Sequence, residues 1–342
     1  MDVEDTPKIL VVKLSAMGDI VHVLPAVHRL RELLPSATIH WLVSSRWAPL
    51  LKGVRGLDRV LTLDRGVVPY LSAMGMLRKG GYRLAVDLQG LLKSAVLARA
   101  GGKVVGFDTA FAREPVAAIL YSAKVSPLKE HVVEQLVEVA EGAARLLGTG
   151  NPTSGANPFF GIGVTDDEVE WGHGCLRSLG LSPPFAVLLP GTGWSTKTWS
   201  PDKFARLAEM MSMELSLPSL VVWGPGEEGL IPKGRGLFVA PPTGVREMMA
   251  LLALSSLVVG GDTGPLHVAA ALGVPVVGLY GPTLPERNGP YTDKAEVVVK
   301  SCPHRGQHKR ECAEPCVESI PVPQVFHAVR RALGRAQSPN SL

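Results

Sequence analysis

The residues best suited to chemistry lie in short polar segments that directly follow apolar runs. The first such segment is residues 15–19 (SAMGD). Gly18 permits a sharp turn, which would aim the Asp19 carboxylate into a cleft, where it could take a proton from a substrate hydroxyl. The alternative is that Asp19 only helps to start the helix that follows.

A second segment, residues 260–267 (GGDTGPLH), lies between an apolar run and a helical pattern. Thr263 is a plausible N-cap and Pro265 a plausible first-turn residue. Backbone N–H groups at such a helix start form an anion site that suits a diphosphate. His267 alone on a helix is more often a structural residue than a catalytic one.

A third segment, residues 191–199 (GTGWSTKTW), also separates a predicted strand from a predicted helix. Its small hydroxyl-bearing residues and Lys197 suit phosphate oxygens. The spacing is not that of a Walker motif, which excludes a P-loop ATPase. The alternative is that Lys197 is an ordinary solvated loop lysine.

A fourth segment, residues 224–229 (GPGEEG), matches G-x-G-x-x-G. A dinucleotide-binding oxidoreductase would rest on this motif alone, and Pro232 and Gly234 interrupt the helix that should follow it. We interpret the segment as a loop in which Glu227 or Glu228 could hydrogen-bond a ribose.

Alternating strands and helices must position these segments. The chain has 342 residues, which favours two domains. Doubly wound sheets bind ligands at the carboxyl ends of their strands. We predict an α/β fold of two Rossmann-like domains facing across a cleft, with boundaries at 1–160 and 161–322 and a final helix in 323–342 packing back on the first domain. The predicted strands are 8–14, 38–43, 60–63, 84–88, 186–190, 220–223, 257–259 and 274–279, and the first helix begins near Leu24.

Charge and hydropathy restrict the partners and the compartment. Residues 1–150 hold 19 Lys and Arg against 14 Asp and Glu, an excess of five, which suggests an anionic partner for this half. The basic residues are not interleaved with aromatics, so nucleic acid is not expected. The N-terminus lacks an apolar signal core, and the longest apolar stretch, 266–280, is interrupted and too short for a bilayer. We therefore expect a cytoplasmic protein.

Cys302, Cys312 and Cys316 cluster in the sequence near His304 and His308. A zinc site is conceivable, but the spacing matches no common ligand pattern. We favour reduced thiols and expect no metal.

Two long segments resemble a known family. Residues 8–27 (KILVVKLSAMGDIVHVLPAV) are similar to the opening of the ADP-heptose:lipopolysaccharide heptosyltransferases of glycosyltransferase family 9. Residues 258–283 (VVGGDTGPLHVAAALGVPVVGLYGPT) are similar to their donor-binding segment. Residues 87–94 (DLQGLLKS) and 112–115 (AREP) resemble the heptosyltransferase I group in particular.

The resemblance implies a GT-B fold and an inverting transfer of L-glycero-D-manno-heptose from ADP-heptose, without metal or cofactor. It implies a lipid A acceptor carrying Kdo, peripheral contact with the cytoplasmic face of the inner membrane, and a monomer. Asp19 would be the catalytic base. By the same resemblance, the donor would be bound by Thr192, Gly193, Lys197, Glu227, Glu228, Asp262, Thr263, Gly264 and His267, and the acceptor by Ser15, Gly18, Lys93 and Arg113.

Beyond Thr283 the cysteine-containing segment departs from the typical heptosyltransferase I pattern. Two alternatives therefore stay open. One is a sugar transferase of the same superfamily with another donor or acceptor. The other is a non-catalytic nucleotide-binding protein.

Overall fold

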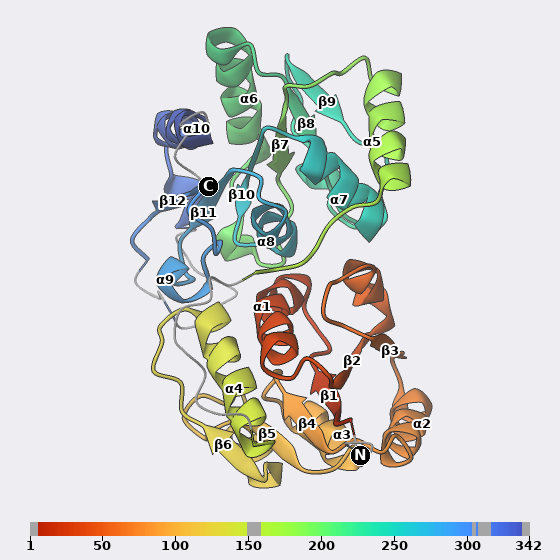
Figure 1. The fold of residues 1–342 in the computed structure, drawn as a ribbon. Helices are drawn as coiled ribbons and strands as arrows, with labels where there is room; N and C mark the ends of the chain where they lie inside the picture. The colour runs from red at the N-terminus through yellow and green to blue at the C-terminus, as the bar shows by residue number, and fades with distance from the viewer. Residues whose placement is uncertain (1–5, 149–158, 303–305, 307–315, 337–342) are drawn as a thin grey trace. The chain divides into compact units, whose positions relative to one another are not determined.

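The computed structural model describes residues 6–148, 159–302, 306 and 316–336. The chain divides into two compact units, Met1–Ile162 and Gly163–Leu342. Each unit is built on one six-stranded sheet in which every strand pair is parallel (Figure 1). The predicted α/β class, with two doubly wound domains, is confirmed.

The first unit has the strand order β3-β2-β1-β4-β5-β6. Its central strands are short apolar runs buried on both faces, as a parallel sheet covered by helices requires. Helices α1 and α4 pack together, and α3 packs with α2 and against β1, β4 and β5. Its elements are β1 Lys8–Val12, α1 Met17–Leu33, β2 Thr38–Ser44, η1 Ser45–Leu51, β3 Arg59–Leu63, α2 Val67–Arg78, β4 Leu84–Asp87, α3 Leu92–Ala100, β5 Val104–Phe107, η2 Pro115–Leu120, β6 Ala123–Val125 and α4 Val132–Leu146.

The predicted start of the first helix near Leu24 is wrong, because α1 begins at Met17 and contains Pro25 in its interior. An interior proline removes one backbone hydrogen bond and disfavours a helix. Here the apolar residues around it are buried, from Ile20 to Val27, so tertiary packing outweighs the local cost. As a result, Gly18 and Asp19 belong to the first turn of a helix rather than to a sharp loop.

The second unit has the strand order β12-β11-β10-β7-β8-β9, the same winding as the first. Gly260 pairs in register with Leu189, and a Cβ on Gly260 would lie 2.8 Å from the Leu189 Cβ, so glycine permits this close approach. Its elements are α5 Asp166–Ser178, β7 Ala186–Leu189, η3 Ser195–Lys197, α6 Pro201–Leu215, β8 Ser219–Val221, η4 Glu228–Leu230, β9 Leu237–Val239, α7 Val245–Leu254, β10 Leu257–Gly261, α8 Gly264–Ala271, β11 Val276–Tyr280, α9 Pro285–Asn288, β12 Ala295–Val299, η5 Val317–Ser319 and α10 Val322–Ala336.

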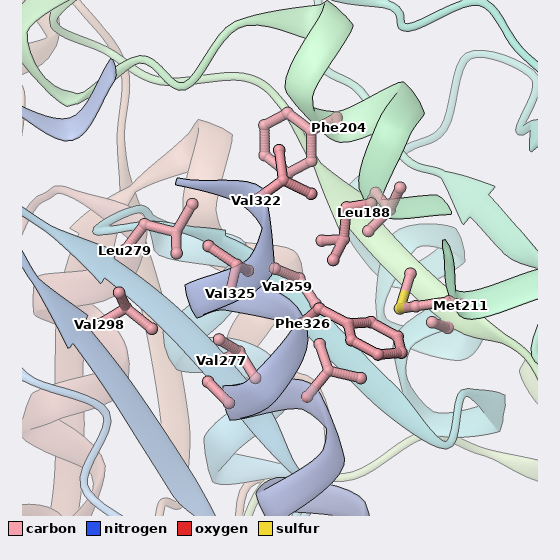
Figure 2. Packing of buried hydrophobic residues seen from close by; sticks show 14 of the residues in the cluster. Leu188, Phe204, Met211, Val259, Val277, Leu279, Val298, Val322, Val325 and Phe326 are labelled. Carbon is pink, nitrogen blue, oxygen red and sulfur yellow. The ribbon is translucent and has the colours of Figure 1, made fainter. Parts of the chain in front are cut away.

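The C-terminal helix α10 packs on this second sheet and on α6. Val325 and Phe326 are buried in the core with Leu188, Val259 and Val277 (Figure 2). We expected this segment to pack back on the first domain, but its apolar face forms part of the second unit's own core. None of the helices in the described ranges is long and apolar enough to cross a bilayer.

Candidate functional site

Three of the polar segments singled out in the sequence meet at one edge of the second sheet. They follow β7, β8 and β10, and β7 lies between the other two strands. Parallel strands place their carboxyl ends at the same edge, which is where doubly wound sheets bind ligands. The fold therefore brings the segments 191–199, 224–229 and 260–267 side by side.

Lys197, Asp262 and His267 form one polar cluster at this edge. The Lys197 Nζ lies 2.6 Å from Oδ2 of Asp262 and 3.5 Å from its carbonyl oxygen. The His267 Nε2 lies 3.2 Å from the other carboxylate oxygen, Oδ1. All three side chains are mostly buried, with exposed fractions of 13%, 11% and 6%. The carboxylate therefore fixes both a lysine ammonium and an imidazole.

Two opposing effects act on the Asp262 carboxyl. Burial disfavours its ionised form, whereas the hydrogen bond with His267 and the charge of Lys197 favour it. The two partners outweigh burial, so the pKa of Asp262 lies well below its usual range. Burial raises the pKa of Tyr280 well above the ordinary value, and the charge of nearby Asp262 raises it further. Tyr280 therefore keeps its proton at neutral pH and is no candidate for a base.

The loop that carries Lys197 is held by short-range contacts. The Thr192 hydroxyl donates to the Trp194 carbonyl at 2.9 Å and lies 2.8 Å from the Thr198 hydroxyl. The Lys197 Nζ lies 4.4 Å from the centroid of the Trp194 ring, a cation–π contact. A Cβ on Gly193 would meet nothing within 4 Å, so the backbone is open there. No role for Trp194 was predicted from the sequence, although an aromatic residue three positions before a loop lysine is a usable signal.

The start of α8 has the geometry of an anion site. Thr263 occupies the N-cap position, as predicted, but its side chain makes no capping hydrogen bond. Its Oγ1 is buried and has no partner among the described residues, and the same holds for Oγ1 of Thr283, which follows β11. Buried hydroxyls without a partner are costly, so these two are candidates for hydrogen bonds with a ligand. Thr283 ends a segment that resembles the family, yet nothing in that pattern marked it as functional.

Glu227 lies between the loops that follow β7 and β8. Its Oε2 accepts a hydrogen bond from the Gly224 N–H at 2.7 Å, and a Cβ on Gly191 would overlap its carboxylate. Glu228 accepts a longer bond, 3.4 Å, from the Gly226 N–H. The motif ends within the three-residue 3-10 turn η4, Glu228–Leu230, and does not lead into an α-helix. A dinucleotide fingerprint needs that helix, so the motif is a loop that holds Glu227.

In the first unit, Asp19 is the third residue of α1. Its Oδ2 accepts a hydrogen bond from the Ala16 N–H at 3.2 Å, as a residue that starts a helix does. The same oxygen lies 3.8 Å from NH1 of Arg113, and the two side chains are 40% and 66% exposed. Asp19 thus helps to start the helix and still presents its carboxylate to solvent beside a cation.

A buried network fixes the loop before Asp19. The Gln89 Oε1 accepts hydrogen bonds from the backbone N–H groups of Leu14, at 3.0 Å, and Ser15, at 3.2 Å. Gln89 is in turn held by Asp87, whose Oδ1 accepts from the Gln89 N–H at 2.9 Å. The other oxygen of Asp87 accepts from the hydroxyls of Ser94 and Tyr121 at 2.9 and 2.8 Å. No role for Gln89 was predicted from the sequence, since its contact with residues 14–15 forms only when β1 and β4 pair.

Arg113 lies beside Asp19 because the next residue, Glu114, is hydrogen-bonded to the start of α3. Glu114 accepts a hydrogen bond from the Leu92 N–H at 2.7 Å, and its own N–H donates to the Gly90 carbonyl at 2.8 Å. Gly90 has φ 70°, and a Cβ there would lie 3.0 Å from the Arg113 nitrogen, so glycine is required. Lys93 is exposed at the beginning of α3.

The suggested zinc site falls largely on residues 303–305 and 307–315, which lie outside the described residues and include His304, His308 and Cys312. Cys302 and Cys316 are both buried. Within the described part of the chain, no group of three or more metal-ligating side chains occurs.

Comparison with known families identifies the chain. The model of glycosyltransferase family 9 (heptosyltransferase) matches residues 71–318, a range that contains all three segments at the edge of the second sheet. The chain belongs to glycosyltransferase family 9. It is accordingly a glycosyltransferase, and the predicted family is confirmed.

Similar proteins carry heptosyltransferase names. The chain is 31% identical over 306 residues to lipopolysaccharide heptosyltransferase 1 of Salmonella typhimurium, which covers 83% of this chain and 91% of the relative. It is 32% identical over 306 residues to the protein of the same name from Pseudomonas aeruginosa, covering 83% and 81%.

Solved structures support the GT-B fold. The fold of this chain resembles that of E. coli heptosyltransferase WaaC with ADP, with a TM-score of 0.74 and 24% identity. The match covers 95% of this chain and 99% of that chain. The fold also resembles E. coli ADP-heptose lps heptosyltransferase II, with a TM-score of 0.76, 20% identity, and coverage of 97% and 100%. The predicted GT-B class is confirmed.

Proposed function

We propose that this family 9 enzyme transfers L-glycero-D-manno-heptose from ADP-heptose to a Kdo-lipid A acceptor in the synthesis of the lipopolysaccharide inner core. The observation that carries the proposal is the cluster of Lys197, Asp262 and His267 beside the start of α8. The names of the relatives from Salmonella typhimurium and Pseudomonas aeruginosa support it.

The second unit would bind the nucleotide sugar. Lys197 and the N–H groups at the start of α8 would meet the diphosphate, on which negative charge develops as the bond to the sugar breaks. Because a nucleoside diphosphate is a good leaving group, the transfer needs no acid to protonate it. Glu227 or Glu228 would meet the ribose, and the donor site would also include Thr192, Gly193, Asp262, Thr263, Gly264 and His267.

The first unit would bind the acceptor. Asp19 would take the proton from the attacking hydroxyl, which would displace ADP with inversion at the anomeric carbon. The hydrogen bonds that the Gln89 Oε1 accepts from the N–H groups of residues 14 and 15 support this role, because they fix the loop that leads to Asp19. Arg113 and Lys93 are cations that an anionic acceptor would contact. Ser15, just before α1, and Gly18, in its first turn, would line the same site.

The test is a transfer assay with ADP-heptose and Kdo-lipid A that follows the release of ADP. We expect Asp19→Asn to lower kcat by about 10²–10⁴-fold. The same variant should bind ADP as tightly as the wild type in calorimetry, because Asp19 belongs to the acceptor side. Full activity of a folded Asp19→Asn protein would show that Asp19 is not the catalytic base.

Two alternatives have distinct outcomes in the same experiment. A preference for a UDP sugar in a donor panel would point to another transferase activity within the family. Binding of ADP without product from any acceptor would point to a nucleotide-binding protein that is not catalytic. We further propose that the enzyme is a monomer that works at the cytoplasmic face of the inner membrane.

A further inference from the structure

Helix α2, Val67–Arg78, is an apolar helix with little cover. No charged residue occurs from Val67 through Leu77. Only Ala73 and Leu77 are buried. A surface helix of a folded domain ordinarily turns polar residues outward, so this composition calls for a partner.

The most exposed apolar residues of α2 lie in its first two turns. Val67 is 75% exposed, Val68 is 78% exposed and Leu71 is 59% exposed. Leu92, the first residue of the neighbouring helix α3, is 42% exposed. Because α2 packs against α3, these side chains belong to adjoining parts of one surface.

Positive charge brackets the same helix. Between residues 64 and 83 the chain carries four basic residues and one acidic residue, Asp64. All five side chains are exposed, and no ion pair to the basic ones occurs within the described residues. The four basic residues are Arg65, Arg78, Lys79 and Arg83.

The helix is joined to the side of the unit where the acceptor is proposed to bind. The hydroxyl of Tyr70, within α2, donates a hydrogen bond to the Lys93 carbonyl at 2.6 Å. Both α2 and α3 follow strands of one parallel sheet, so their first residues lie near its carboxyl edge (Figure 1). Asp19 and Arg113 belong to the same edge.

We propose that α2 is a membrane-docking helix that lies in the interface of an anionic lipid bilayer. Its exposed apolar turns would enter the headgroup boundary, and the bracketing cations would meet lipid phosphates. A second copy of the chain fits less well, because a symmetric contact would bring the two sets of cations together. The proposal rests on the proposed function for its biological purpose, since a lipid acceptor gives the enzyme a reason to sit on a bilayer.

The experiment measures binding of the full chain to vesicles that contain no acceptor. Vesicles of phosphatidylglycerol and phosphatidylethanolamine are compared with vesicles of phosphatidylcholine by co-sedimentation. We expect the wild type to bind the anionic vesicles and the triple variant Val67→Ser/Val68→Ser/Leu71→Ser to bind them about tenfold less tightly or weaker still. Arg78→Gln/Lys79→Gln should bind less tightly at low salt and resemble the wild type at high salt.

A matched control removes three exposed apolar side chains from the second unit. Met213, Val239 and Val299 are 77%, 38% and 37% exposed, and their joint replacement by serine should leave vesicle binding unchanged. Thermal unfolding checks that each triple variant is folded. Equal binding of the wild type and the α2 variant, or dimers of the wild type in light scattering without vesicle binding, would overturn the proposal.

A second assay separates this proposal from the proposed function. Heptose transfer is measured on a Kdo saccharide that lacks acyl chains and on Kdo-lipid A in vesicles. We expect the α2 triple variant to lose rate only on the vesicles. Vesicle binding without transfer to either acceptor would leave the docking helix standing and reject the proposed reaction.

Discussion

The Nζ of Lys197 lies 2.6 Å from Oδ2 of Asp262, while Oδ1 of the same carboxylate lies 3.2 Å from Nε2 of His267. One buried carboxylate thereby orients two groups that can carry positive charge. The Trp194 ring confines the same ammonium from another side. A lysine with four rotatable stem bonds is fixed before any ligand arrives, which lowers the entropic cost of binding a diphosphate.

Replacement of Lys197 by methionine should weaken ADP binding. The variant keeps much of the stem volume but removes the charge that would meet the diphosphate, so we expect the Kd for ADP to rise about 10–100-fold in calorimetry. Lys203→Met is the matched control, because Lys203 pairs with Glu318 at 3.2 Å in the same unit. An unchanged Kd in Lys197→Met would show that this lysine does not contact the nucleotide.

Asp262→Asn should destabilise the protein in a pH-dependent manner. The folded-state pKa of Asp262 lies below its usual range, so its ionised form stabilises the fold above the unfolded-state pKa of about 4 and loses this effect as pH falls further. At pH 7 we expect a loss of about 2–4 kcal/mol in the free energy of unfolding, because Lys197 is left without its carboxylate. In urea unfolding, the difference in the free energy of unfolding between wild type and variant should become smaller below about pH 4. A difference of equal size at pH 7 and pH 3 would contradict this account.

Gln89 acts as a positioning residue through the loop before Asp19. Gln89→Leu removes the oxygen that accepts from the Leu14 and Ser15 N–H groups, so we expect kcat to fall about tenfold with an unchanged Kd for ADP. Gln89→Glu keeps an accepting oxygen and should recover most of the rate. Equal rates for the leucine and glutamate variants would show that the hydrogen bonds do not position the base.

Tyr121→Phe should destabilise the first unit more strongly as pH rises. Burial raises the pKa of Asp87, and the Tyr121 hydroxyl is one of the donors that oppose this effect. Without that donor the folded-state pKa of Asp87 rises further. The loss of stability in Tyr121→Phe therefore grows as pH increases through the titration of Asp87. At pH 7 we expect the free energy of unfolding to fall by about 1–3 kcal/mol in urea denaturation. Ser122→Ala is a suitable control, because the Ser122 hydroxyl accepts from the Val104 N–H and does not bond to Asp87. A loss that does not vary with pH would contradict the proposed link to Asp87.

Much of the fold was predictable from hydrophobic patterning. The predicted run 8–14 contains the observed strand β1, and the predicted run 257–259 lies within β10. Both could be found because buried parallel strands are short and apolar throughout. Strand β6, of three residues and only partly buried, lacks that signal. The start of α1 was misplaced because the proline rule is local, whereas the burial that overrides it comes from packing on α4.

The candidate site was predictable in its residues but not in its contacts. The composition of the loop 191–199 pointed to Lys197, the resemblance added Asp262 and His267, and strand order explains why they meet. The support of Ser15 by Gln89 needs the pairing of β1 with β4, which no spacing along the chain reveals. Helix α2 was missed as an element because its apolar residues follow no one-sided period, and this uniform character is also what leaves it uncovered.

The two sheets follow the same winding, so β1 and β7 hold the same place in their units. The loop after β1 leads to Asp19, and the loop after β7 leads to Lys197. One strand order thus occurs twice within a single chain, and the segment after its first strand carries Asp19 in one unit and Lys197 in the other. In the proposed reaction, the same topological position would remove a proton in one unit and neutralise a leaving group in the other.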